Sequence, residues 1–124
     1  MTPLPAHPAP VPSGDGLRFS LDLSADSVVF DGHFPGTPML PAVAQVDWAI
    51  RLAREHLSLP PRVSGLRSLK FLRVIQAPAR LALDLSPTRD GRGVEFAYSH
   101  AGAACSQGRI EFSDDAARTD RPLL

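Results

Sequence analysis

A histidine and an aspartate are the best candidates for catalysis in this sequence because of the segments that carry them. His33 lies in GHFPGTPMLP, residues 32–41, where two glycines and three prolines constrain the backbone. Asp47 follows fourteen residues later, in a stretch of valine, alanine and tryptophan. Imidazole and carboxyl groups are common general bases and acids in enzymes. The two residues therefore suit a reaction that moves protons.

Each of the two residues also has a simpler interpretation. A histidine can occupy a turn with unusual backbone angles, and Asp47 can pair with Arg51 four residues later in a helix. The loop is more constrained than a connector needs to be, and a carboxylate is costly to bury without a partner. A metal site of His33, Asp47 and His56 is the weaker alternative, since no H-x-x-x-H or C-x-x-C spacing is present. We expect an acid–base site without metal or cofactor.

The helix that follows the loop is expected to be buried. It should run from Pro41 to about Leu57, because proline suits the first helical position. Apolar residues recur at helical spacing, at Val43, Val46, Ile50, Ala53 and Leu57. Between residues 40 and 50 only Gln45 and Asp47 are polar, a pattern typical of a buried helix. Its free N–H groups, around Pro41–Val43, are suited to binding a carbonyl oxygen.

Strands are expected before and after this helix in the sequence. Alternating residues predict a strand from Leu17, a turn near residues 24–27 and a short strand ending at Phe30. β-Forming residues run from 63 to 76. Three further strands are predicted at Leu81–Leu85, Val94–His100 and Ala103–Phe112. This layout predicts an α+β domain in which an antiparallel sheet covers one long helix.

Length and composition indicate a single domain without a membrane span. A chain of 124 residues suits one core over residues 17–114, with a proline-rich flexible tail at 1–16 and a second tail at 115–124. The net charge is zero, which argues for neither nucleic acid nor membrane as a partner. A single cysteine, Cys105, excludes an internal disulfide and is interpreted as a small strand residue. Because no secretory signal or spanning segment is visible, we expect a cytoplasmic location.

The segment GHFPGTPMLPAVAQVDWA, residues 32–49, resembles the signature of the hot-dog-fold 3-hydroxyacyl-acyl-carrier-protein dehydratases. In that family, G-H-F-P-G-x-P-hydrophobic-hydrophobic-P leads into the central helix, and an acidic residue follows the histidine by fourteen positions. His33 and Asp47 keep this spacing. SLKFLRVI, residues 68–75, is similar to a sheet segment of the family. QVDWA, residues 45–49, looks most like the branch associated with aryl polyene clusters.

The resemblance implies a fold, an assembly and a reaction. The fold is a curved antiparallel sheet wrapped around a long helix, and in the dimer His33 of one subunit would face Asp47 of the other. The reaction is dehydration of a carrier-bound 3-hydroxyacyl thioester to the trans-2-enoyl thioester, in fatty acid or aryl polyene/polyketide-type biosynthesis. His33 would take the α-proton, and Asp47 would protonate the departing hydroxyl, directly or through water. The residues expected to hold the thioester, through backbone N–H groups and the loop, are Gly36, Pro41, Ala42 and Val43.

Two residues depart from the family pattern. Ala42 stands where glycine is usual, and its methyl group would crowd a thioester that approaches the backbone. Arg51 stands where glutamine is common, and a neighbouring cation would make an acid a weaker proton donor. These departures leave open a non-catalytic partner subunit, and the fold leaves open thioester hydrolysis or double-bond isomerisation. The intact spacing of His33 and Asp47 favours dehydration.

The middle of the sequence is basic and suggests a protein partner. Residues 51–80 hold seven basic side chains and one acidic one. Such a segment suits an acidic acyl carrier protein whose phosphopantetheine arm delivers the substrate. The expected contacts are Arg62, Arg67, Lys70 and Arg73. An ordinary solvated surface is the alternative for each of them, and a homodimer and a mixed hot-dog assembly both remain open.

Overall fold

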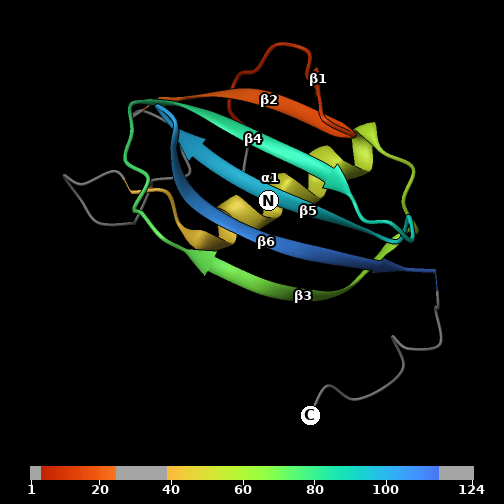
Figure 1. The fold of residues 1–124 in the computed structure, drawn as a ribbon. Coiled ribbons are helices and arrows are strands. Elements are labelled where there is room, and N and C mark those ends of the chain that lie inside the picture. Colours follow the sequence, from red (N-terminus) through yellow and green to blue (C-terminus); the bar gives the residue numbers. More distant parts are fainter. Residues whose placement is uncertain (1–3, 25–38, 115–124) are drawn as a thin grey trace.

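A computed structural model describes residues 4–24 and 39–114 of the chain (Figure 1). Two predicted site residues, His33 and Gly36, lie outside the described residues, as do the predicted strand ending at Phe30 and the predicted tail at 115–124. The described part holds one helix and six strands. Their bounds are β1 Val11–Ser13, β2 Gly16–Leu23, α1 Ala42–His56, β3 Arg62–Phe71, β4 Ala79–Pro87, β5 Gly93–His100 and β6 Ala103–Ser113.

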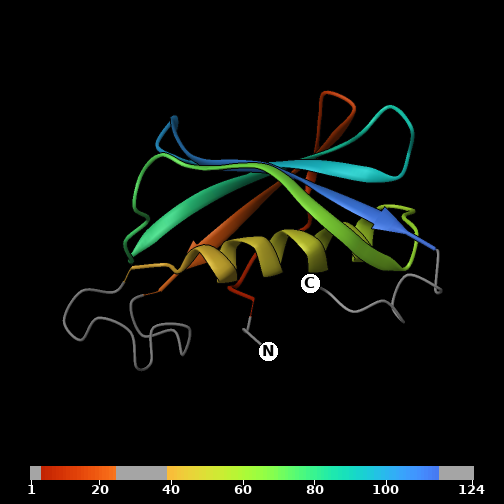
Figure 2. The same ribbon diagram turned by 90° about the horizontal axis from the view of Figure 1, so that it is seen from below.

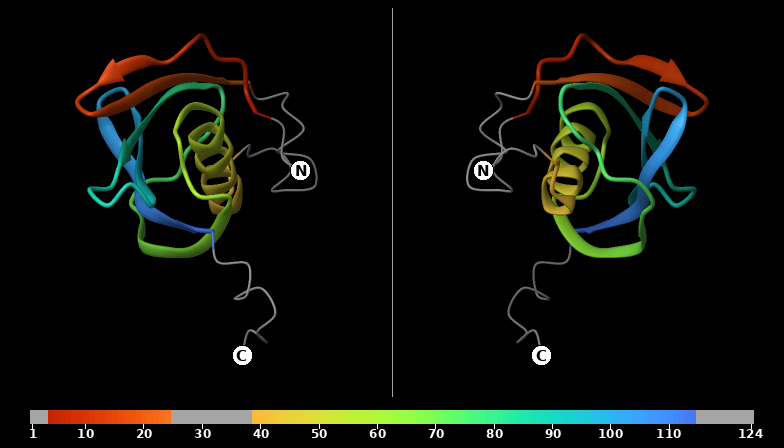
Figure 3. Two further views of the ribbon diagram at one scale, coloured as in Figure 1. Left: turned by 90° about the vertical axis from the view of Figure 1, so that its right-hand side faces the viewer. Right: turned by 90° about the vertical axis from the view of Figure 1, so that its left-hand side faces the viewer.

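The strands form one antiparallel sheet in the order β1-β2-β4-β5-β6-β3. The sheet curves around α1, which packs against one of its faces (Figures 2 and 3). β2 and β4 alternate strictly or nearly so between buried and more exposed positions, because one face meets the helix and the other meets solvent. The α+β fold is confirmed, and the three strands predicted after residue 80 lie in β4, β5 and β6.

The helix α1 begins and ends within one residue of its predicted bounds. Its N-cap, Pro41, has an extended conformation and makes no side-chain capping hydrogen bond. At the other end the N–H of Leu57 donates to the carbonyl of Ala53 at 2.8 Å. No helix in the described parts of the chain combines the length and the apolar character needed to cross a bilayer.

The buried face of α1 coincides only in part with the face that the apolar spacing predicted, since Ala53 is buried but Val43 is not. The buried residues are Ala44, Gln45, Trp48, Ala49, Leu52 and Ala53. Val43, assigned to the core by spacing, is 75% exposed, and Val46 and Ile50 are only partly buried. The first half of the helix is apolar nearly all round, so spacing alone did not distinguish its two apolar faces.

The core lies between α1 and the inner face of the sheet. Its largest fully buried side chains are Trp48 of the helix and Tyr98, Phe19 and Phe96 of the strands. Cys105 is buried in β6, in agreement with its interpretation as a strand residue. This core holds α1 in a fixed place along the sheet, which fixes where the residues of its first two turns lie.

Part of the proline-rich N-terminal segment joins the sheet. The N–H of Asp22 donates to the carbonyl of Ala6 at 2.9 Å, and Val11 of β1 lies opposite Arg18 of β2. The sequence predicted that the domain begins at Leu17. Strand pairing in fact begins earlier, with β1 at Val11. Prolines predicted a tail here, but β1 is an edge strand, and edge strands tolerate proline.

The opposite edge of the sheet is long and carries exposed apolar residues. Val63, Leu66 and Phe71 of β3 lie opposite buried residues of β6, so their side chains point toward the face that carries α1. They nevertheless remain 37%, 44% and 45% exposed. We call the exposed apolar residues of this strand the β3 apolar strip: Val63, Leu66, Leu69 and Phe71.

Candidate active site

The start of α1 carries three of the predicted substrate-binding residues, Pro41, Ala42 and Val43. The preceding segment is tied to the loop before β4, since the N–H of Leu40 donates to the carbonyl of Ile75 at 2.8 Å. Within the first turn, the N–H groups of Ala44 and Gln45 both donate to the carbonyl of Pro41. Among the described residues the N–H groups of Ala42 and Val43 have no backbone acceptor. Within the described part of the chain they are therefore available to a ligand.

A cavity of about 280 Å³ opens beside this helix start. Its walls come from the two segments that precede and begin α1 and from the end of β3 with the residues after it. The lining residues are Met39, Leu40, Pro41, Ala42, Gln45, Phe71, Leu72, Arg73 and Val74. An apolar cavity with one cation and free N–H groups suits a thioester whose arm carries a negative charge.

Asp47 lies on α1, one turn after Val43, and is half-buried. Its carboxylate oxygen Oδ2 is buried and has no hydrogen-bond partner among the described residues. Arg51 lies 3.6 Å from that oxygen, measured from Nη1, so the ion pair given as the simpler interpretation is present. The contact is longer than a good charge-assisted hydrogen bond. The ion pair therefore leaves this oxygen able to accept a hydrogen bond from a ligand.

A buried polar cluster holds Gln45, which lies on α1 between the helix start and Asp47. The Ser106 hydroxyl donates to Oε1 of Gln45 at 2.6 Å, and Nε2 of Gln45 donates to the Leu40 carbonyl at 3.3 Å. The Tyr98 hydroxyl donates to the Gln45 carbonyl at 2.7 Å. Burial raises the pKa of Tyr98 well above its usual value, and the negative charge of Asp47 raises it further. The Tyr98 hydroxyl therefore remains a protonated donor close to Asp47.

Comparison with known proteins identifies the family. A family model described as ApeI dehydratase matches residues 11–109. The chain belongs to the ApeI dehydratase family. The dehydratase family predicted from residues 32–49, with its aryl polyene branch, is thus confirmed. A search of curated protein sequences found no match.

Solved structures share the fold of this chain. The dehydratase heterocomplex ApeI:P from Xenorhabdus doucetiae is 29% identical, with a TM-score of 0.78, and the match covers 86% of this chain and 96% of that one. An uncharacterized protein from Erwinia carotovora subsp. atroseptica is 24% identical, with a TM-score of 0.64 and coverage of 86% and 90%. The pyran synthase domain from module nine of the sorangicin pathway is 19% identical, with a TM-score of 0.72 and coverage of 99% and 44%. The hot-dog fold is confirmed by these matches.

The structure brings together some of the predicted site residues of this ApeI-family chain. Pro41, Ala42 and Arg73 line the same cavity, and Asp47 lies on the same helix. His33 and Gly36 lie outside the described residues, so the predicted approach of His33 to Asp47 stays a prediction.

The remaining basic residues predicted to meet a carrier protein lie along β3. Arg62, Arg67 and Lys70 are all exposed. Arg67 already pairs with Glu111 of β6, with Nε 2.9 Å from Oε1. Lys70 and Arg73, close to the mouth of the cavity at the end of β3, are therefore better placed than Arg67 to meet a second anion.

Sequence reasoning missed Ser106 and Tyr98. They lie 61 and 53 residues from Gln45 in the chain, and no local pattern joins them to it. The signal that was available was Gln45 itself, a polar residue in the apolar half of the helix.

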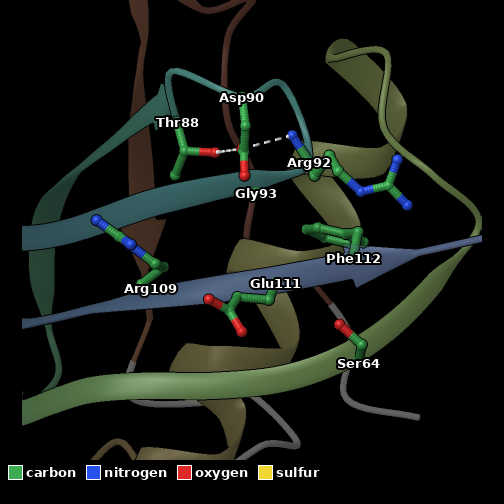
Figure 4. A pocket seen from close by; sticks show the side chains of 8 residues that line it. All are labelled: Ser64, Thr88, Asp90, Arg92, Gly93, Arg109, Glu111 and Phe112. Atoms are coloured by element: carbon green, nitrogen blue, oxygen red, sulfur yellow. Dashed lines mark hydrogen bonds between the residues drawn. The ribbon is translucent and has the colours of Figure 1, made fainter.

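A second pocket, of about 250 Å³, lies away from the helix start (Figure 4). Its charged groups already have partners: Thr88 Oγ1 and the N–H of Arg92 donate to Asp90 at 2.6 and 3.0 Å, and Glu111 accepts from Arg67. These two hydrogen bonds, that from Thr88 first, lower the pKa of the Asp90 carboxyl. Because these polar groups are engaged within the turn and the ion pair, this pocket is a weaker candidate for the active site than the cavity beside the helix start.

Proposed function

We propose that the chain dehydrates a 3-hydroxyacyl chain bound as a thioester to an acyl carrier protein. The observation that carries the proposal is the buried Oδ2 of Asp47, which has no hydrogen-bond partner among the described residues. Asp47 lies on the same helix start as the N–H groups of Ala42 and Val43, for which the described residues offer no backbone acceptor. A carboxyl group beside a carbonyl-binding helix start suits elimination of a hydroxyl group β to a thioester. Membership of the ApeI dehydratase family supports the same reaction.

The proposed steps follow from the roles of these groups. His33 removes a proton from the α-carbon, and the electrons of that C–H bond form the new α–β double bond. The C–O bond at the β-carbon breaks, and Asp47 donates a proton to the departing hydroxyl, which leaves as water. The N–H groups of Ala42 and Val43 stabilise the negative charge that develops on the thioester oxygen. The product is the trans-2-enoyl thioester.

We also propose that the active form contains two hot-dog subunits joined along β3. The β3 apolar strip and the exposed Val43 support this, since exposed apolar residues in a row mark association surfaces. The opposite edge strand, β1, has three residues and offers little to pair with. In this assembly His33 of one subunit meets Asp47 of the other. A second copy and a different hot-dog protein both suit the edge, and the ApeI:P structure is a heterocomplex.

The test is a mass measurement on the carrier-bound substrate. Wild type should remove one water from a carrier-bound 3-hydroxyacyl chain, and His33→Ala and Asp47→Asn should each slow this at least roughly a hundredfold. Short, long and aryl-terminated chains should be compared. If wild type is inert on all three, the non-catalytic partner subunit is favoured, with Ala42 and the Arg51 contact as the cause. Release of the acyl chain from the carrier would instead indicate a hydrolase.

Docking of the carrier protein is proposed along β3, with Lys70 and Arg73 at the end of the strand next to the cavity and Arg62 at its far end. Arg67 is a weaker contact because it already pairs with Glu111. Lys70→Glu should raise KM for a carrier-bound substrate roughly threefold to tenfold and leave KM for a small thioester unchanged, because only the carrier contributes acidic groups. Arg89→Glu, the same charge change on the exposed loop between β4 and β5, is the control and should change neither value. Equal effects of Lys70→Glu on both substrates would rule out this docking site.

A further inference from the structure

Gln45 and Ser106 stand apart from the rest of the core because they are polar. Among the described residues they are the polar side chains that are buried, at 4% and 2% exposure. A buried amide or hydroxyl is tolerated only when it is hydrogen-bonded, and an apolar pair of similar size would fill the same space at little cost in stability. Folding alone therefore does not account for this pair.

The Gln45 amide closes a bridge across the first turn of α1. Its Nε2 reaches back to the carbonyl of Leu40, before the helix, while its Oε1 accepts from Ser106 on β6. Leu40 is held in turn by its own N–H bond to Ile75. The residues enclosed by the bridge are Pro41, Ala42, Val43 and Ala44, which include both proposed carbonyl-binding N–H groups.

The main chain of Gln45 is held as well. The Tyr98 hydroxyl of β5 donates to its carbonyl at 2.7 Å, and burial raises the pKa of Tyr98, so the hydroxyl stays a donor even above the pH at which an exposed tyrosine ionises. Two neighbouring strands therefore hold one helical residue by its side chain and by its backbone. Asp47 follows two residues later, so the same contacts set the position of the acid relative to the sheet.

The bridge replaces an ordinary helix cap. A Ser, Asp or Asn cap would fix the first turn by accepting from one of its N–H groups, and that group would then be lost to a ligand. Pro41 makes no such side-chain bond. Gln45 fixes the turn from inside the helix, through the Leu40 carbonyl, and takes up neither the Ala42 nor the Val43 N–H group.

We propose that Gln45 is a positioning residue of the dehydration site: oriented by Ser106, it holds the first turn of α1 so that the Ala42 and Val43 N–H groups meet the thioester oxygen. The proposal rests on the proposed function. Preorganised donors stabilise a developing oxyanion because they need not reorganise during the reaction, and misplacement by about 1 Å can cost roughly a hundredfold in rate.

The test compares Gln45→Met, Ser106→Ala and the double variant. In each, kcat for the carrier-bound substrate should fall roughly tenfold to a hundredfold with little change in KM, because the interaction lost acts mainly in the transition state. The double variant should be no slower than Gln45→Met, since both changes break one bridge. Ile110→Val, a fully buried change on β6, is the control for lost packing and should leave kcat unchanged.

A second readout does not depend on turnover. Backbone ¹⁵N relaxation on the assembled protein should show lower order parameters at residues 42 and 43 in Gln45→Met and Ser106→Ala than in wild type and Ile110→Val. If either Ser106→Ala or Gln45→Met keeps the wild-type kcat and order parameters, the positioning role is wrong. If wild type has no dehydratase activity, the proposed function fails, while the relaxation result still shows whether Gln45 holds the turn.

Discussion

At the scale of single residues, Asp47 combines the two interpretations that its sequence context offered. It has the arginine contact expected for an ordinary helical ion pair, 3.6 Å from Oδ2, and that same oxygen is buried without a hydrogen bond among the described residues. An ion pair of this length between half-exposed partners contributes up to about 1 kcal/mol. The Arg51 contact is therefore weak and leaves Oδ2 of Asp47 able to accept a hydrogen bond from a ligand.

Replacement of Arg51 by the residue common in the family tests this. Arg51→Gln should raise kcat for dehydration about threefold to fivefold, because Oδ2 of Asp47 loses a competing contact worth up to about 1 kcal/mol and becomes more available to the substrate hydroxyl. The measurement is steady-state turnover of a carrier-bound substrate. Arg54→Gln is the control, because it removes the same charge one turn further along α1. There the side chain donates to the Pro61 carbonyl instead of contacting Asp47. A slower Arg51→Gln enzyme would show instead that Arg51 orients Asp47.

At the scale of elements, β6 lies between β5 and β3 and joins the edge strand β3 to the rest of the sheet. Gly108 lies opposite Phe96 of β5, and a Cβ at this position would collide with Cδ2 of Leu69 and lie 2.9 Å from Cε2 of Phe96. The absence of a side chain lets Leu69 of β3 and Phe96 pack over the strand between them. This glycine thus helps set the surface of the β3 apolar strip.

Gly108→Ala should lower the free energy of unfolding by about 1–3 kcal/mol, the usual cost of overpacking. Chemical denaturation at one fixed protein concentration measures it, since assembly contributes to apparent stability. Gly65→Ala in β3 is the matched control, because its added Cβ would meet only Oε1 of Glu111, at 3.5 Å. Equal losses in the two variants would mean that crowding at Gly108 is relieved by movement of Leu69.

At the scale of the whole molecule, the sheet formed by the described residues has one short edge strand and one long edge strand. The N-terminal segment covers β2 with β1, whereas β3 is a ten-residue edge strand with apolar side chains that α1 does not cover. Exposed edges of this kind are normally protected or paired. Together with the exposed Val43, this supports the proposed second subunit on the β3 side, which would also bring a second site into contact with the first.

Leu66→Lys should break that assembly, because a buried charge without a partner is costly at an interface. Analytical ultracentrifugation should show the variant at monomer mass, with its dehydratase activity reduced at least tenfold, since the proposed site needs residues from both subunits. Ser20→Lys introduces the same charge on the outer face of β2 and should change neither property. Wild type that is monomeric when purified alone would assign the β3 edge to a different hot-dog protein.

The sequence by itself determined the features that are encoded locally. Proline and glycine punctuation, helical spacing and strand alternation placed α1 and the strands β4 to β6, and the spacing of His33 and Asp47 within one continuous segment identified the family. These features depend on residues within a few turns or a single loop of one another, which is the range over which backbone preferences and side-chain periodicity act.

Tertiary structure decided the features that depend on packing between distant segments. Which apolar face of α1 is buried was settled by the fit of Trp48 and Ala49 against the sheet, and Val43 was left outside. The role of β1 followed from its pairing with β2, against the expectation from its prolines. Ser106 and Tyr98 reach Gln45 only because β5 and β6 cross α1 at that point, and neither hydrogen-bonding nor close packing between such residues leaves a local trace in the sequence.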